Sequence, residues 1–254
     1  EWSAARHKGG FEGPCQVEFR LARDSVTIDY NSPGMDEVGF EEALKHVVDS
    51  PKGHLGIPQI GNLGIGLWAF NQIGTKATFY SKGSGSVPPV TVTLRRESHE
   101  AEFEDPKAGK SRQTPGMTIR INGLFQDPTK PYASLAPDKL RRSLAERFDA
   151  YLRSGQLKIR IICGERTMEV EPLRLDLPPV GGGFREVALT SDPTKRFRTQ
   201  FWFDPSGNGK VSIRHTGVVI LDDLCLIQEY GLNDTLFSSG FIRGFVDADF
   251  LKPL

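Results

Sequence analysis

The sequence predicts an α+β fold in two domains, and three observations lead to this prediction. Residues 15–30 alternate apolar and polar side chains around a short turn, which is typical of two paired strands. Residues 137–152 instead place an apolar side chain at every fourth position, as an amphipathic helix does. The character of the chain changes near residue 130. We therefore expect a first domain over residues 1–130 and a smaller α/β domain over residues 131–254.

The first domain is expected to combine strands with two helices. Asp36 can cap a helix that ends near His46, and the apolar run after Gly66 predicts a second helix that ends near Ile73. The charged segment 97–115 has no periodic apolar pattern, so we expect it to be irregular. Further strands of this domain are expected over residues 76–81, 90–94 and 117–121.

The second domain is expected to consist mainly of strands after its helix. The segment 178–183 is rich in Pro and Gly, and these residues favour a connecting loop. Strand-forming residues gather on both sides of that loop. The expected strand segments are 157–163, 168–170, 199–203, 211–221 and 240–247.

Composition argues against several classes of protein. The 254 residues carry 32 Lys and Arg against 32 Asp and Glu, so the net charge of +0 gives no overall attraction to nucleic acid or to an anionic membrane. The 3 cysteines and 5 histidines are dispersed, which argues against a zinc site or a disulfide framework. No stretch approaches the roughly 20 apolar residues of a membrane span, and no signal peptide opens the chain. We therefore expect a cytoplasmic protein that does not enter a membrane, and a chain that begins inside a longer polypeptide because its first residue is not Met.

A glycine-rich segment is the strongest candidate for a binding site. Gly61, Gly64 and Gly66 immediately precede the apolar run of the second expected helix. Glycines permit close approach, and the backbone N–H groups at the start of a helix attract phosphate. The Gly-Lys-Ser/Thr ending of a P-loop is absent. The segment is therefore a candidate phosphate loop, although a glycine turn that contacts only its own chain has the same pattern.

Four stretches of the chain, in this order, carry motifs that occur together in one superfamily. Residues 26–35 (VTIDYNSPGM) are similar to a strand that ends in D-x-G-x-G-M, and residues 57–66 (IPQIGNLGIG) to a second glycine box. Residues 116–121 (GMTIRI) are similar to a later strand, and residues 240–251 to the end of a transducer domain. The chain thus resembles the GHKL ATPases, which include DNA gyrase, the heat-shock-ninety chaperones, histidine kinases and DNA mismatch-repair ATPases.

The resemblance implies a Bergerat-type ATP-binding α/β sandwich followed by a transducer-like domain. It implies that ATP and Mg²⁺ are the cofactors, that ATP is hydrolysed, and that ATP-bound chains form a homodimer which acts on a protein or DNA client. A lid over residues 36–66 would close over the phosphates. The nucleotide-binding residues that it implies are Asp29, Asn31, Gly34, Met35, Gly61, Asn62, Leu63, Gly64, Ile65, Gly66 and Thr118.

The roles implied for these residues have a physical basis. Asp29, near the end of a strand, would accept a hydrogen bond from the adenine amino group, and Thr118 or a nearby hydroxyl would bind that carboxylate. Gly34 would let the chain turn closely against the base, and Met35 would supply an apolar wall. Glu1 would be the general base that activates water for hydrolysis.

The chain departs from the family pattern at both ends of the expected site. Counting back from Gly34 without a gap puts Tyr30, not Asp29, at the adenine-binding position, and these two side chains would point to opposite faces of a strand. If Glu1 is the base, Ala5 stands where the family has a magnesium-binding asparagine. Alanine offers no oxygen ligand to Mg²⁺, so no metal ligand is predicted.

Two hypotheses about function follow from the resemblance and these departures. One is an ATP-binding and ATP-hydrolysing switch, in which nucleotide orders the lid and reorients the second domain. The other is a degenerate module of the same fold that binds a protein or nucleic-acid partner and hydrolyses nothing. Arg243 and Lys252 are the nearest candidates for the cation that would sense the γ-phosphate.

Overall fold

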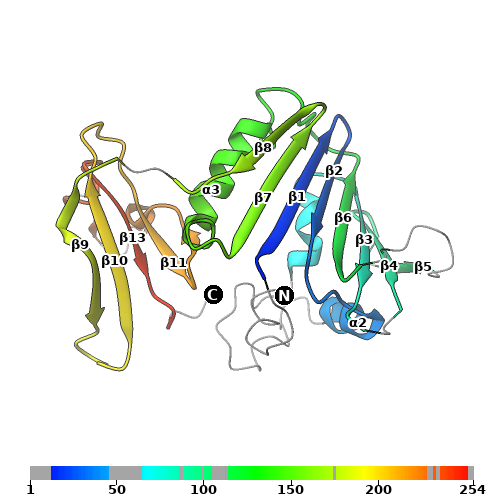
Figure 1. The fold of residues 1–254 in the computed structure, drawn as a ribbon, viewed down its shortest axis with the longest axis horizontal. Coiled ribbons are helices and arrows are strands. Elements are labelled where there is room, and N and C mark those ends of the chain that lie inside the picture. Colours follow the sequence, from blue (N-terminus) through cyan, green and yellow to red (C-terminus); the bar gives the residue numbers. More distant parts are fainter. Residues whose placement is uncertain are drawn as a thin grey trace. The chain divides into compact units, whose positions relative to one another are not determined.

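The computed structural model has an α+β fold and divides into two compact units (Figure 1). The first unit consists of Glu1–Ala145 and Tyr151–Glu171, and the second of Glu146–Ala150 and Pro172–Leu254. Within them the structure describes residues 13–45, 65–85, 88–98, 100–104, 112, 114–173, 176–227, 231–232 and 235–250. Among the described helices, none is both long enough and apolar enough to cross a membrane.

An eight-stranded mixed sheet forms the first unit, in the order β5-β4-β3-β6-β2-β1-β7-β8 (Figure 1). Its strands are β1 (Cys15–Ala22), β2 (Ser25–Tyr30), β3 (Lys76–Lys82), β4 (Val90–Arg95), β5 (Ala101–Glu104), β6 (Gly116–Asn122), β7 (Leu157–Cys163) and β8 (Arg166–Val170). Neighbouring strands are antiparallel except β1 and β7, which are parallel. The strand predictions for β1, β2, β3, β4, β6, β7 and β8 are confirmed, with ends shifted by one or two residues in several of them.

Helix α3 (Pro137–Arg153) explains where the first unit ends. β6 and β7 run in the same direction, because β2 is antiparallel to both β6 and β1 while β1 is parallel to β7. Two strands of the same direction need a crossover connection, which is usually a helix. β7 then pairs with the edge of β1 that β2 leaves free. The first unit consequently continues to Glu171, whereas the sequence placed a boundary at residue 130.

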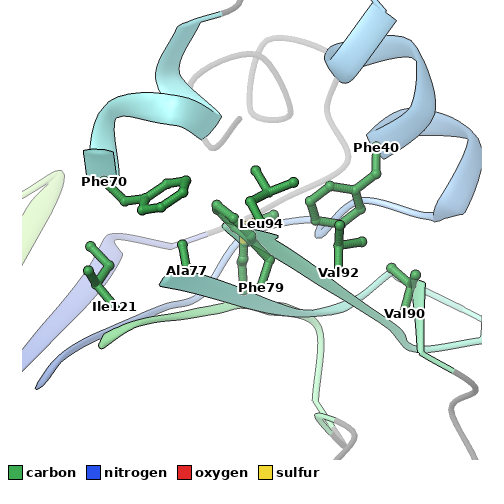
Figure 2. Packing of buried hydrophobic residues seen from close by; sticks show 9 residues of the cluster. Phe40, Phe70, Ala77, Phe79, Val90, Val92, Leu94 and Ile121 are labelled. Carbon is green, nitrogen blue, oxygen red and sulfur yellow. The ribbon is translucent and has the colours of Figure 1, made fainter. Parts of the chain in front are cut away.

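Two helical segments lie on one face of this sheet. Helix α2 (Glu37–Lys45) contributes Phe40, and the 3-10 helix η2 (Ile65–Gln72) contributes Phe70. Figure 2 shows both rings over the strands that carry Phe79 and Ile121. Phe40 is fully buried, and its ring meets the ring of Phe79 edge-to-face with 6.0 Å between centroids. One buried cluster therefore joins α2 and η2 to the sheet. We call this face the helix-covered face.

A five-stranded mixed sheet forms the second unit, in the order β12-β11-β13-β10-β9 (Figure 1). Its strands are β9 (Pro179–Ala188), β10 (Arg196–Phe203), β11 (Val211–His215), β12 (Val218–Leu221) and β13 (Ile242–Asp247), and a 3-10 helix, η3 (Leu224–Leu226), follows β12. β11 and β13 are parallel, and the other neighbours are antiparallel.

The middle of α3 is anchored in the second unit by a buried ion pair. Asp149 lies 3.9 Å from Arg214 of β11, and both side chains are about nine-tenths buried, at 10% exposure each. The Asp149 carboxylate also accepts a hydrogen bond of 2.9 Å from the backbone N–H of Leu173. The Arg214 guanidinium stacks over the ring of Phe245, 4.0 Å from its centroid. These contacts assign residues 146–150 of α3 to the second unit.

Two strands lie where the sequence predicted irregular structure. β5 falls in the charged segment 97–115, and it is an edge strand whose Glu102 forms a 2.9 Å ion pair with Arg95 of β4. β9 falls in the Pro/Gly-rich segment 178–183. An edge strand tolerates charged residues and an initial Pro, because half of its backbone groups need no partner. The signals that favour loops were therefore also compatible with edge strands.

Candidate functional site

The two glycine-containing motifs of the first unit lead to the same face of the sheet. Met35 is the last residue of the first motif, and Leu67 and Trp68 follow the second. All three side chains pack against the buried cluster that holds Phe40 and Phe79. The turn at residues 31–35 and the start of η2 therefore both lie on the helix-covered face. This face is where a ligand could contact both motifs at once.

The turn before α2 requires glycine at position 34. Gly34 has φ +73°, and a Cβ atom there would lie 2.1 Å from the backbone oxygen of Lys82. The neighbouring residue is bound to the same part of β3, since the Met35 N–H donates to Ser81 Oγ at 2.7 Å and Ser81 Oγ donates to Met35 O at 2.8 Å. The turn thus lies directly against the end of β3, with no room for a side chain between them.

Asn31 forms hydrogen bonds with the backbone of its own chain, so these atoms do not line an open binding surface. Its side-chain Oδ1 accepts a hydrogen bond from the backbone N–H of Gln16, and its Nδ2 donates to Pro14 O at 3.1 Å. The backbone N–H of Asn31 also donates to Gln16 O at 3.2 Å. These bonds attach the end of β2 to the start of β1. The predicted nucleotide contact of Asn31 would therefore have to use atoms outside these bonds.

Asp29 lies on the face of the sheet opposite to Met35. Successive strand residues alternate between faces, and Tyr30 packs against the buried cluster of the helix-covered face. Asp29 sits opposite Thr118 in the β2–β6 register, and the Thr118 hydroxyl donates to its carboxylate. Arg112 donates to both Asp29 Oδ1 and, at 2.8 Å, to Thr118 Oγ1. The predicted contact between Thr118 and Asp29 exists, but it lies on the other face from the two glycine motifs.

Tyr30 occupies the corresponding place on the helix-covered face. It sits opposite Met117 in the register, and its hydroxyl donates to Met117 Sδ at 3.2 Å. The residue that an ungapped count puts at the adenine-binding position is therefore the one that faces the site. Of these two neighbours, only Tyr30, whose side chain is uncharged, lies on the face that carries the glycine motifs.

Arg112 was not predicted from the sequence, because it lies in a charged segment without periodicity. Its guanidinium is mostly buried, with 13% of the side chain exposed. Gly116 leaves room for it, since a Cβ atom there would lie 2.5 Å from Arg112 Nη2. Ser81 was also not predicted as a site residue. It is a polar residue on the same side of its strand as the apolar Ala77 and Phe79, and this position could have indicated its role.

The helix η2 carries two buried polar atoms, Trp68 Nε1 and Asn71 Oδ1, that have no hydrogen-bond partner in the described part of the chain. The two residues are three apart, and side chains with this spacing lie on the same side of a 3-10 helix. One atom is a donor and the other an acceptor. A buried polar atom without a partner costs free energy, so an occupant with both a donor and an acceptor would stabilise this part of the face.

Several predicted site residues cannot be compared with the structure. Glu1, Gly61, Asn62, Leu63 and Gly64 lie outside the described residues, as do Ala5 and Lys252. Ile65 and Gly66 begin η2, and only their backbone is described. Arg243 is described, and its guanidinium binds Asp204 at 3.0 Å and the backbone oxygen of Asn208 at 3.1 Å.

The described residues offer no ready place for Mg²⁺. No group of three His, Cys, Asp or Glu residues among them could hold a metal ion. Asp29, the carboxylate that the resemblance implies at the base, is bound to Arg112 and faces away from the glycine motifs. We therefore assign no step to a metal.

The chain was also compared with known proteins. No protein-family model matches it, and no curated protein sequence matches it significantly. The function is therefore inferred from the residues and geometry given above.

Proposed function

We propose that this chain is an ATP-binding module whose nucleotide state controls its conformation. The observation that carries the proposal is the convergence of Met35 with Leu67 and Trp68 on one buried cluster. It brings the Gly34 turn and the end of the glycine-rich segment to one face, which supports the proposal of a Bergerat-type ATP-binding domain followed by a transducer-like domain. ATP hydrolysis belongs to the same proposal.

The proposed binding mode follows from the chemistry of each part. Met35 would contact the base, because the Gly34 turn places it on the helix-covered face. The backbone N–H groups of residues 61–66 would bind the phosphates, which glycine permits at close range. Trp68 Nε1 and Asn71 Oδ1 offer a buried donor and acceptor on the same segment. Ordering of residues 36–66 around the phosphates would be the conformational signal, transmitted to the second unit and to a homodimer.

Binding of ATP to the unmodified chain, measured by titration calorimetry with millimolar nucleotide and Mg²⁺, is the primary test. Saturable binding is expected. Replacing Gly64 with Asp is expected to weaken that binding by at least about a hundredfold, because a carboxylate at the phosphates adds several kcal/mol of repulsion.

The matched control for this test is Gly155→Asp, which adds the same charge to a turn with open space around its Cβ position. It is expected to bind ATP like the unmodified chain. Absence of any binding heat in the unmodified chain would contradict the proposal, and so would equal affinities of the Gly64 and Gly155 variants.

A second candidate function is a degenerate module that binds a partner without hydrolysing ATP. The position of Asp29 favours it, because this carboxylate is bound to Arg112 and Thr118 on the opposite face. Tyr30 faces the site instead, and its hydroxyl is bound to Met117 Sδ. On this hypothesis the site would lack a charged acceptor for the adenine amino group.

Steady-state release of phosphate separates the two candidates. If the chain is an ATPase, turnover is expected, and Glu1→Ala is expected to lower it by about 10²–10⁴-fold, the usual contribution of a general base. The control Glu165→Ala removes an exposed carboxylate from the β7–β8 turn and is expected to leave turnover unchanged. Absence of turnover in a chain that binds ATP would establish the degenerate module.

A further inference from the structure

The end of β13 is attached to the turn between β11 and β12 by two aspartates. Thr216 and Gly217 form this turn, with φ 50° and 79°. The Thr216 N–H donates to Asp249 Oδ1 at 2.8 Å, and the Asp247 carboxylate lies beside the Gly217 N–H. A β-branched residue with positive φ is strained, so the turn depends on such external bonds. We call Asp247, Asp249 and these two turn residues the clasp.

One guanidinium nitrogen forms ion pairs with both carboxylates of the clasp. Arg198 Nη2 of β10 lies 3.2 Å from Asp247 Oδ2 and 2.9 Å from Asp249 Oδ2. The Asp247 side chain is 9% exposed, whereas that of Asp249 is 45% exposed. The second oxygen of Asp247, Oδ1, is buried and has no hydrogen-bond partner among the described residues. Their contact with the same nitrogen makes the two carboxylates close neighbours. Two ionised carboxylates side by side repel each other, and a proton shared between them would turn the repulsion into a hydrogen bond.

The other charged groups around the clasp have partners of their own. Arg214, opposite Asp247 in the β11–β13 register, is paired with Asp149 of α3. Glu186 of β9, opposite Arg198, forms a 2.9 Å ion pair with Arg196. His215 is buried, with Nδ1 3.5 Å from the backbone oxygen of Ala248. Among the described residues, Arg198 is thus the cation in contact with both carboxylates. Its single positive charge is opposed by two negative charges when both carboxyl groups are ionised.

We propose that Asp247 and Asp249 share one proton, so that the clasp is a pH-responsive device that tightens when the proton is bound. Asp247 takes the proton from solvent and donates it in a hydrogen bond to the Asp249 carboxylate. Asp249 stays ionised, and therefore keeps both its ion pair with Arg198 and its hydrogen bond from Thr216. Loss of the proton at higher pH restores the repulsion and loosens the turn at residues 216–217.

The sign of the pH dependence follows from linkage. Burial and the charge of Asp249 raise the pKa of Asp247 above its ordinary value. A carboxyl whose pKa is raised by folding contributes stability below its unfolded pKa, and that contribution is lost as the pH rises through the folded pKa. The clasp is therefore expected to stabilise the second unit as the pH falls towards about 4, the ordinary pKa of an aspartate, which is opposite to the effect of an ion-paired carboxylate.

Hydrogen exchange of peptides from residues 211–221, in the intact chain and corrected for the intrinsic pH dependence of exchange, tests the proposal. Protection of Thr216 and Gly217 is expected to rise as the pH falls from neutral towards about 4, the ordinary pKa of an aspartate. The variant Asp247→Asn, whose amide can donate to Asp249 at any pH, is expected to keep high protection throughout.

Two further variants keep the test decisive. Asp249→Asn removes the second charge, so its pH dependence is expected to be weaker than that of the unmodified chain, with only the effect of burial left. Asp222→Asn changes an exposed carboxylate in the same part of the second unit and is expected to retain the rise of the unmodified chain. Protection that falls with acid in the unmodified chain, or an equal rise in the Asp247 and Asp249 variants, would overturn the proposal.

Discussion

Replacing Asp149 with alanine is expected to lower the free energy of unfolding of the second unit by about 3–5 kcal/mol. The substitution removes a carboxylate 3.9 Å from Arg214 and leaves that guanidinium buried beside Phe245. It also removes the acceptor for the backbone N–H of Leu173. A buried charge that loses its counter-charge is one of the most costly changes in a protein interior. Hydrogen exchange of peptides from residues 196–221 in increasing urea measures the loss.

The double variant Asp149→Leu with Arg214→Met provides the control for this interpretation. It replaces both charges with apolar side chains, so no unpaired charge remains, and such replacements are often close to neutral. The double variant is therefore expected to be more stable than either single variant. If the losses of the two single variants simply added, the ion pair would not be the cause.

Replacing Gly34 with alanine is expected to destabilise the first unit by about 2–4 kcal/mol and to abolish ATP binding. The new Cβ would lie 2.1 Å from the backbone oxygen of Lys82, and a residue with φ +73° is strained unless it is glycine. The turn would have to move away from β3 and would lose both hydrogen bonds between Met35 and Ser81. Urea denaturation followed by circular dichroism measures the first effect, and calorimetry with ATP the second.

Gly85 is the matched control for Gly34. Its φ is almost the same, +72°, but no atom lies within 4 Å of the position of its Cβ. Gly85→Ala is therefore expected to show only the conformational cost of a left-handed residue, about 1–2 kcal/mol, and to bind ATP normally. Equal effects of the two substitutions would show that the contact with β3 is unimportant.

The sequence predicted secondary structure well wherever periodicity was strong. The alternation in residues 15–30 and the four-residue spacing of α3 both correspond to elements of the structure. Periodicity failed in two edge strands, β5 and β9, because edge strands admit the charges, Pro and Gly that usually mark loops. It also predicted a helix after Gly66 without distinguishing its type, which is 3-10 in η2.

The candidate site could be predicted only in part. The positions of Gly34 and Met35 in a tight turn followed from local chemistry, because glycine alone adopts that conformation without strain. Local chemistry did not predict which of Asp29 and Tyr30 faces the helix-covered side, since a shift of one residue moves every side chain of a strand to the other face. Arg112, which binds Asp29, came from a segment whose sequence has no pattern.

By itself, the sequence determined the α+β class, most of the strands, the main helix and the two glycine motifs, because these depend on contacts between residues close in the chain. Only the tertiary structure decided that β7 and β8 complete the first sheet, that Asp29 faces Arg112 while Tyr30 faces the buried cluster, and that Asp247 meets Asp249 and Arg198. Each of these depends on strand register or on residues far apart in sequence. Register is set by the packing of a whole face, and no local pattern records it.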